Sequence, residues 1–278
     1  MQARRMAHSS VVEAIIDDVV AVAATHGLRC TQPRILRDRS NLLLWLFPTP
    51  VVARVPRLSR VIRPNPERHL RAELEIALHL RSHGLPVVQP SPEIAHGPHR
   101  ITHGYCTFWQ HHHLIDIQPH PAELTESIAA MHKALLTFHG DLTDFGPLAD
   151  LRHGSERLTW TEPERTQLAN TIAWFDQSLA NVISQPLHGD THPGNILATT
   201  HGTLWTDFED AWVGPTDWDY AALVEEPVVV DSQPSWTTFE LCRQLRSVHS
   251  ALWAQVLRPG AYAQAAKAVL LRDRIPNT

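Results

Sequence analysis

One short segment, residues 186–197, constrains the fold of this chain more than any other. It reads Pro-Leu-His-Gly-Asp-Thr-His-Pro-Gly-Asn-Ile-Leu. Pro193 and Gly194 preclude a regular helix here, because proline has no backbone N–H to donate and glycine weakens a helix. Asp190 and Asn195 lie five positions apart in the segment. We therefore expect a loop that presents a carboxylate and an amide side chain close together.

The residues after this loop predict a β-hairpin that brings a second carboxylate to it. Two short apolar runs, residues 195–199 and 203–207, are joined by Thr-His-Gly, a turn sequence. Asp207 ends the second run, twelve residues after Asn195, so a hairpin places the two residues side by side. Their oxygens suit Mg²⁺, which keeps waters and takes few protein ligands. Phosphoryl transfer needs such a cation, and a carboxylate such as Asp190 to accept the proton of the attacking hydroxyl.

The rest of the chain divides into a smaller part with strands and a larger helical part. Two apolar runs around Pro-Thr-Pro predict another hairpin, and Thr161-x-x-Glu164 is a capping-box sequence. The composition becomes polar and rich in histidine from Gln110 to His120, so we predict lobes of residues 1–110 and 111–278. The expected strands are residues 41–47, 51–55 and 105–109, and the expected helices are residues 9–27 (capped by Ser9 or Ser10), 66–82, 121–138, 161–182 and 235–274.

At the loop and the hairpin the chain resembles the aminoglycoside phosphotransferase and choline kinase family, relatives of the protein kinases. The family's HGDxxxxN loop is matched from His188 to Asn195, and its metal-binding triplet is matched by Asp207-Phe-Glu. A later G-D-P-x-x-D-L-A pattern is matched loosely at residues 214–221, where Asp219 is the expected buried brace of the loop. The resemblance spans roughly residues 35–225. It implies an α+β, protein-kinase-like two-lobe fold, with a small N-terminal antiparallel-sheet lobe and a larger, mainly helical C-terminal lobe.

The resemblance also implies a cation that clamps the nucleotide phosphates from the strand at residues 51–55. Arg54 is the candidate there, and an arginine on the protein surface is the alternative. Protein kinases place lysine at this point, but the forked arginine side chain can also hold phosphates. A glutamate of the next helix should pair with it, with Glu73 favoured over Glu75 by spacing.

Two further parts of the nucleotide site follow from the same resemblance. The loop that covers the phosphates would be residues 37–41, which contain no glycine. Ser40 and Asn41 would contact phosphate in place of a glycine-rich backbone. The adenine would bind near Gln110 to His112, through backbone groups.

The implied activity is transfer of the γ-phosphate of ATP or GTP to a hydroxyl of a small molecule. Asp190 would be the catalytic base, Asn195 and Asp207 would hold Mg²⁺, and His188 would hold the loop. An aminoglycoside, another antibiotic, a sugar and an amino alcohol are all candidate acceptors. The acidic residues that could bind a cationic acceptor are Glu225, Glu226, Asp231 and Glu240.

Other interpretations of the same residues remain open at this point. A catalytically weak nucleotide-binding or regulatory pseudokinase would explain the missing glycines and the absent lysine. His188 and His192 have the spacing of a zinc pair, but only on a helix. The histidine run 111–113 is either a metal site or a solvated linker. Asp190 alone could be a loop cap, because aspartate favours such positions.

Composition excludes several other classes of protein. The net charge of −5 differs from the basic character of most nucleic-acid-binding domains. The three cysteines are few and widely spaced, so we expect a reducing, cytoplasmic setting rather than a disulfide scaffold. Acidic residues interrupt the apolar stretch at residues 11–24, which favours an amphipathic helix over a signal peptide. No membrane association is expected, and the chain would act as a monomer or a homodimer.

Overall fold

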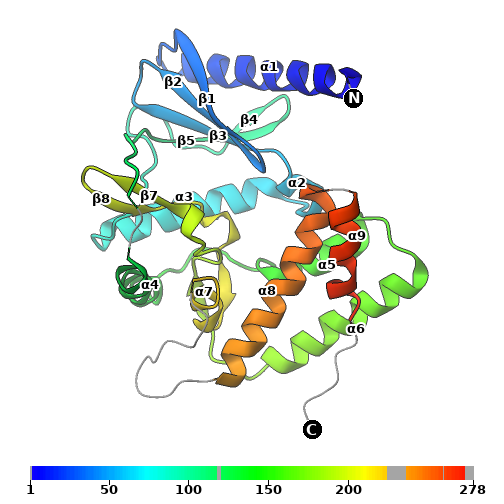
Figure 1. Cartoon of the computed structure of the whole chain (residues 1–278). Coiled ribbons are helices and arrows are strands. Elements are labelled where there is room, and N and C mark those ends of the chain that lie inside the picture. Colours follow the sequence, from blue (N-terminus) through cyan, green and yellow to red (C-terminus); the bar gives the residue numbers. More distant parts are fainter. Residues whose placement is uncertain (1, 118–119, 224–235, 259, 273–278) are drawn as a thin grey trace.

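A five-stranded antiparallel sheet forms the N-terminal part of the chain, below a long helix (Figure 1). The computed structural model describes residues 2–117, 120–223, 236–258 and 260–272. The strands lie in the order β1-β2-β3-β5-β4. The elements of this lobe are α1 (Gln2–Thr25), β1 (Gln32–Asp38), β2 (Asn41–Phe47), β3 (Val51–Pro56), α2 (Ser59–Ile62), α3 (Pro66–Ser82), β4 (His99–Ile101) and β5 (Gly104–Gln110).

The alternation of side chains along β2 and β3 gives the sheet one apolar face and one face toward the site. Leu42, Leu44 and Leu46 are fully buried and pack in one cluster with the apolar side chains of α1. Each such leucine contributes about 1.5–3 kcal/mol by leaving water. The side chains between them point the other way, because successive strand residues face opposite sides. Leu43 and Arg54, which are paired across the two strands, therefore share the second face.

Helices dominate the C-terminal part and enclose a second, larger apolar core. The β7–β8 hairpin lies at its upper edge, next to the sheet lobe (Figure 1), and β6 pairs with β9 in a second two-stranded sheet. The elements are α4 (Pro121–Leu135), α5 (Pro147–Arg157), α6 (Glu162–Leu179), β6 (Gln185–Leu187), η1 (Pro193–Asn195), β7 (Ile196–Thr199), β8 (Gly202–Trp205), η2 (Phe208–Asp210), β9 (Trp212–Gly214), α7 (Asp217–Tyr220), α8 (Trp236–Leu257) and α9 (Ala261–Leu270).

The β7–β8 hairpin is fastened to both parts of the chain. On one side, the Val88 N–H donates to the Trp205 carbonyl over 2.8 Å. On the other side, the Ile115 N–H donates to the Ala198 carbonyl over 2.9 Å. The segments after α3 and after β5 therefore hold the hairpin between the lobes. The chain passes from β5 to α4 across residues 111–120, where the sequence places the lobe boundary, and that division stays a prediction.

The structure confirms most of the predicted elements and corrects several of their limits. The first hairpin, the helix α3, the strand β5 and the Thr161 capping box lie where the sequence predicts them. The first helix begins at Gln2, not at Ser9 or Ser10, and α4 ends at Leu135 rather than at residue 138. The tail forms two helices, α8 and α9, instead of one continuous stretch. The strand β1 was not predicted, because it is largely exposed and carries no alternating apolar pattern.

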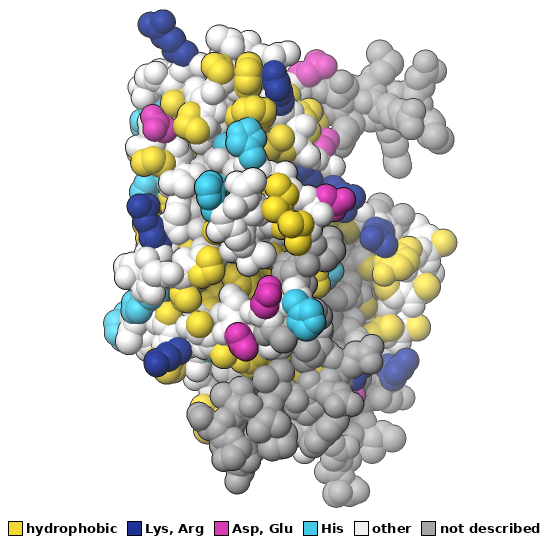
Figure 2. All heavy atoms as spheres, turned by 60° about the vertical axis from the view of Figure 1, so that its left-hand side comes forward, with side chains coloured by type: hydrophobic (Ala, Val, Ile, Leu, Met, Phe, Trp, Pro, Cys, Tyr) yellow, Lys and Arg dark blue, Asp and Glu magenta, His cyan; other side chains and the backbone are white. Residues whose placement is uncertain are grey.

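Figure 2 shows the molecule turned so that the left-hand side of Figure 1 comes forward. Among its coloured atoms, acidic and basic side chains lie singly between hydrophobic ones, and histidines are frequent. In the part of the chain that the structure describes, no helix combines the length and the apolar character needed to cross a membrane.

Candidate active site

Asp219 holds the loop between β6 and β7 from below. Its carboxylate accepts the backbone N–H groups of His188, at 3.1 Å, and of Gly189, at 2.9 Å. His132 Nε2 lies 2.8 Å from the same carboxylate. Burial alone would raise the pKa of this carboxyl, but the interactions with His132 and His188 and the hydrogen bond from the Gly189 N–H together outweigh burial and lower the pKa. Asp219 therefore has the contacts that the expected brace requires.

Gly189 is required by the shape of the loop. Its φ of +87° lies in the left-handed region that disfavours side chains. A Cβ at this position would lie 1.9 Å from the carbonyl oxygen of Asp210. The Trp218 indole N–H donates to the Gly189 carbonyl over 2.6 Å. The backbone of η2 and the ring of Trp218 therefore enclose this residue, and only glycine fits.

The two histidines of the loop bond to the loop itself. His188 is fully buried, and its Nδ1 accepts the Asp190 N–H at 3.2 Å. His192 Nδ1 accepts the Gly194 N–H at 2.9 Å. These residues do not share a helix, since η1 begins at Pro193. The described residues contain no group of three or more His, Cys, Asp or Glu side chains that could hold a metal ion. The geometry thus favours a loop-holding role for His188 over a zinc pair.

Both oxygens of the Asp190 carboxylate have donors. Asn195 Nδ2 donates to Oδ2 over 2.8 Å and to the Asp190 carbonyl over 2.9 Å. Arg246, on α8, donates to Oδ1 over 3.2 Å. Arg246 also stacks over the ring of Trp218, with its guanidinium carbon 4.7 Å from the ring centre. Asp190 is therefore fixed from the loop on one side and from α8 on the other.

The hairpin brings Asp207 to this loop, as the sequence predicts. Ile196 pairs with Trp205 in the ladder, and the next residue, Thr206, donates its N–H to the Asn195 carbonyl over 3.0 Å. Asp207 follows in a left-handed conformation, with φ of +70°, which aspartate tolerates better than most side chains. This turn ends the strand and carries the chain into η2.

Arg54 is buried, and it joins three carboxylates. It bonds to Glu73 on α3, to Asp207 Oδ1 at 2.5 Å and to Glu209 Oε2 at 2.6 Å. Only 5% of its surface is exposed, so the surface-arginine alternative is wrong. Glu75 is exposed, and the glutamate that pairs with Arg54 is Glu73. Burial raises the pKa of Glu73 to about 8, against the opposing effect of the Arg54 charge.

A second buried arginine, Arg63, was not predicted as part of the site. It follows α2 and is 2% exposed. Its Nε and one terminal nitrogen bond to the two oxygens of Asp150, at 3.0 and 2.8 Å. It also pairs with Asp210 and donates to the Glu209 carbonyl over 3.3 Å. Arg63 thereby connects the sheet lobe to α5 and to η2, directly behind the Asp207 turn.

A cavity of about 560 Å³ lies between the sheet and the β7–β8 hairpin. Its apolar walls come from side chains such as Leu43, Val52 and Trp109. Its polar lining contains the predicted nucleotide and metal residues Ser40, Asn41, Arg54, Gln110, His112, Asn195 and Asp207. Glu73 is the predicted nucleotide-site residue that does not line it. The expected covering loop is only a turn at Arg39 and Ser40, because β1 extends to Asp38 and β2 begins at Asn41.

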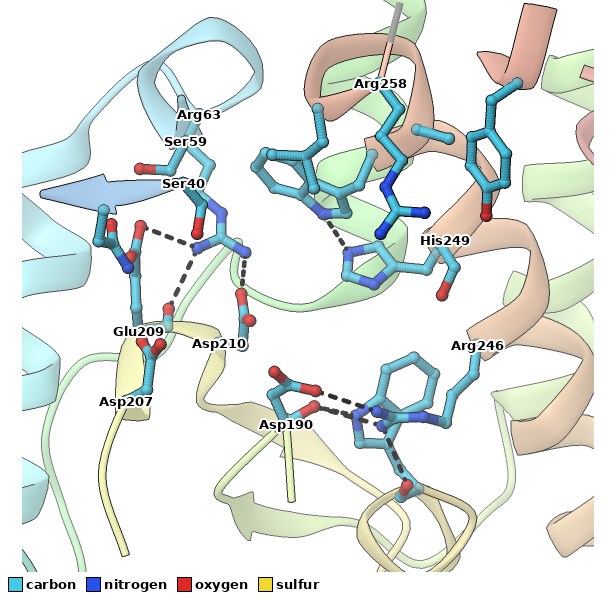
Figure 3. A pocket seen from close by; sticks show the side chains of 18 residues that line it. Ser40, Ser59, Arg63, Asp190, Asp207, Glu209, Asp210, Arg246, His249 and Arg258 are labelled. Carbon is cyan, nitrogen blue, oxygen red and sulfur yellow. Dashed lines mark hydrogen bonds and ion pairs between the residues drawn. The ribbon is translucent and has the colours of Figure 1, made fainter. Parts of the chain in front are cut away.

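A second cavity, of about 370 Å³, lies between Asp190 and α8 (Figure 3). Ser40, Asn41 and Asp207 line both cavities, so the two spaces meet there. The face of α8 that bears Arg246, His249 and the residues beyond them forms one wall. The acidic residue Glu240 does not line this cavity; it is exposed and bonds to Gln244. The other acidic residues considered from the sequence, 225, 226 and 231, lie outside the described residues.

Sequence reasoning missed the residues that α8 contributes. Leu241, Leu245, Val248 and Leu252 form the buried face of this helix. The adjacent face carries Arg246, His249, Trp253 and Leu257, at helical spacing. An arginine and a histidine next to an apolar stripe could have indicated that this helix contributes polar side chains to a site. The sequence does not reveal which loop these side chains contact.

Comparison with known proteins identifies the family and the fold. The family model described as phosphotransferase enzyme family (APH) matches residues 31–240. No curated protein sequence gives a significant match. Among solved structures, amicoumacin kinase hAmiN in complex with AMP-PNP, Ca²⁺ and Ami is 14% identical, with a TM-score of 0.64, over 94% of this chain and 95% of that chain.

Two other solved structures show the same fold. Choline kinase LicA from Streptococcus pneumoniae is 16% identical, with a TM-score of 0.58, over 92% of this chain and 97% of that chain. The GDP complex of aminoglycoside 2'-phosphotransferase-IIIa is 15% identical, with a TM-score of 0.56, over 91% of this chain and 96% of that chain. The predicted kinase-like two-lobe α+β fold is confirmed. Because the family model covers most of its residues, this chain belongs to the phosphotransferase enzyme family.

Proposed function

We propose that this protein transfers the γ-phosphate of ATP or GTP to a hydroxyl group of a small molecule. The observation that carries the proposal is the meeting of the two cavities at Asp207. Asn195 lines the larger cavity and Asp190 lines the smaller one, and the two side chains are hydrogen-bonded. A nucleotide in the larger space and an acceptor in the smaller one would therefore face each other across Asp190 and Asp207.

The larger cavity offers a nucleotide contacts of the kinds it needs. Arg54 lines this cavity and is held there by Glu73, and a guanidinium can bind phosphate oxygens. Ser40 and Asn41 line the same space from the β1–β2 turn. Gln110 and His112 line the same cavity where β5 ends, on the side proposed for the adenine ring.

The residues around Asp207 fit a divalent cation. Asn195 and Asp207 would hold Mg²⁺ through oxygen atoms, with waters completing the shell. Burial and the charges of Glu209, Asp210 and Asp190 raise the pKa of Asp207, although Arg54 opposes them. Such an excess of negative charge favours a cation at this position. When bound, the ion would neutralise charge on the phosphates during transfer.

Asp190 is suited to handle the acceptor. Its carboxylate orients the attacking hydroxyl and takes up its proton as the oxygen–phosphorus bond forms. The bond between the γ-phosphorus and the bridging oxygen breaks, and the nucleoside diphosphate leaves with that electron pair. Asn195 and Arg246 keep the carboxylate in place during this step. Most of the catalytic contribution of the protein would come from positioning and charge.

The test is an Asp190→Asn variant, which keeps the shape of the side chain and removes its capacity as a base. Phosphate transfer from Mg·ATP or Mg·GTP is measured across a panel of hydroxyl compounds, and nucleotide affinity is measured by calorimetry. We expect turnover to fall by at least about a hundredfold, with nucleotide affinity nearly unchanged. Asp176→Asn is the control, because Asp176 is a partly exposed residue of α6 that pairs with Arg152 and does not line either cavity.

Two results would contradict the proposal. Wild-type turnover in the Asp190→Asn variant would remove Asp190 from the mechanism. Nucleotide binding without turnover on any acceptor would favour a pseudokinase, for which the arginine at position 54 and the short turn at Ser40 are the supporting features.

A further inference from the structure

Among its described lining residues, the smaller cavity has one arginine side chain that forms no ion pair with the carboxylates of the site. Its described acidic lining residues each have a basic partner. Asp190 pairs with Arg246, Asp207 and Glu209 pair with Arg54, and Asp210 pairs with Arg63. Each of these carboxylates is therefore already in contact with an arginine before an acceptor enters, and Arg54 and Arg63 are each shared by more than one of them.

Arg258 lies at the end of α8 and lines the same cavity. No carboxylate of the described residues forms an ion pair with it. Its guanidinium carbon lies 5.1 Å from the centre of the Tyr262 ring. Figure 3 shows its guanidinium pointing into the cavity, toward His249. An arginine presents several N–H donors in a fixed fork, which matches the two oxygens of a carboxylate or a phosphate.

The wall next to Arg258 is apolar and aromatic. Trp253, Ala254 and Leu257 of α8 line it together with Tyr262 of α9. Trp218 lies on the opposite side, beside Asp190 and Arg246. The volume of about 370 Å³ is within the range of small-molecule sites. The site therefore offers a hydroxyl-binding group, an apolar surface and a cation, in one space.

We infer that the acceptor is a hydroxylated small molecule that carries an oxyanion, either a carboxylate or a phosphate, which Arg258 binds while Asp190 receives the hydroxyl. This inference rests on the proposed function, because it names the substrate class of the same site. At this end of the cavity a cationic acceptor, such as an amino alcohol or an aminoglycoside, would place its charge beside the Arg258 guanidinium and be disfavoured. The position of Arg258 thus favours an acidic acceptor at this end of the cavity.

The first experiment compares acceptors that differ only in charge. Hydroxy carboxylates, with and without an aromatic ring, are tested with Mg·ATP beside their neutral amides, the matching amino alcohols and a set of sugar phosphates. We expect kcat/KM to be about tenfold or more higher for an acidic acceptor than for its neutral amide, since a charge-assisted hydrogen bond is lost in the amide. The carboxylate and phosphate arms separate the two sources of the oxyanion.

The second experiment changes the arginine. Arg258→Gln should raise the KM for the best acidic acceptor about tenfold, with kcat little changed. Arg258→Glu should weaken acidic acceptors further and improve the amino alcohols. Arg258→Lys should retain part of the preference. Arg243→Gln is the matched control, because Arg243 is an exposed arginine of α8 that does not line the cavity.

A binding measurement separates this inference from the proposed function. Calorimetric titration of the same hydroxy carboxylates into protein that holds Mg·AMP-PNP reports binding without turnover. Arg258-dependent binding with no turnover would contradict the phosphotransferase proposal and keep the anion site. A preference for amino alcohols, or acidic acceptors whose KM and affinity are the same in Arg258→Gln, overturns the inference.

Discussion

Arg246 of α8 donates to Oδ1 of Asp190 over 3.2 Å, so a helix more than fifty residues further along the chain fixes the proposed catalytic base. The same side chain reaches the carbonyl oxygens of Gly189 and Trp218, at 3.4 and 3.3 Å. Arg246 thus bonds to the proposed base itself, to the backbone of the residue before it and to the backbone of α7. We interpret it as a positioning residue of the loop.

Replacement of Arg246 by alanine should lower kcat about tenfold to a hundredfold, because a misplaced base costs rate even when binding is intact. The KM for the nucleotide should stay within about twofold, since Arg246 does not line the larger cavity. Arg246→Lys should recover part of the loss, as a lysine can reach one acceptor but not three. Steady-state kinetics with Arg243→Ala as the control checks this. An unchanged kcat in Arg246→Ala would refute the positioning role.

The sequence predicted the parts of the site that depend on local pattern. The family resemblance implied Arg54, and Arg54 faces the site because the leucines of β2 alternate toward the other face of the sheet. Asn195 and Asp207 come together because a three-residue turn sequence joins two short apolar runs, which is also a local signal. Spacing along the helix favoured Glu73 over Glu75, because the position of a residue along a helix determines the side of the helix on which its side chain lies.

The parts of the site that depend on tertiary contact could not be predicted. Arg63 meets Asp150 across 87 residues, and Arg246 meets Asp190 across 56. Neither pair has a short-range pattern, so only the packing of α5 and α8 brings them together. The strand β1 was missed for a different physical reason: an exposed edge strand needs no alternating apolar face. The residues that α8 contributes to the smaller cavity were missed because they lie on a face beside its buried stripe.

Gly189→Ala should destabilise the protein by about 3 kcal/mol or more and abolish transfer. The left-handed backbone costs an alanine about 1–2 kcal/mol, and the added Cβ would lie 1.9 Å from the Asp210 carbonyl oxygen, which cannot move away freely. Gly202→Ala is a matched control, because Gly202 also has a positive φ, of 110°, but has open space around its Cβ position. Chemical unfolding of both variants checks the difference. Equal losses of about 1–2 kcal/mol would show that the contact with Asp210 is not limiting.

The buried histidine His69 should make the fold sensitive to mild acid. Its Nδ1 lies 3.3 Å from the Glu209 carbonyl, and its ring stacks on Phe145. Burial, together with the Arg63 charge, lowers the pKa of His69 from its ordinary value near 6.5 to about 4. Between these two values the unfolded chain takes up a proton that the folded chain does not, so the free energy of unfolding falls as the pH falls.

From pH 7 to pH 5 the loss due to His69 should be roughly 2 kcal/mol. His69→Gln should be less stable at pH 7, because the ring stacking is lost, but its stability should fall less over this pH interval. His139→Gln is the control, since His139 is an exposed histidine, and it should behave as the wild type. Urea unfolding at several pH values measures the slopes. If His69→Gln and the wild type lose the same stability between pH 7 and pH 5, then His69 is not the group that carries the acid sensitivity.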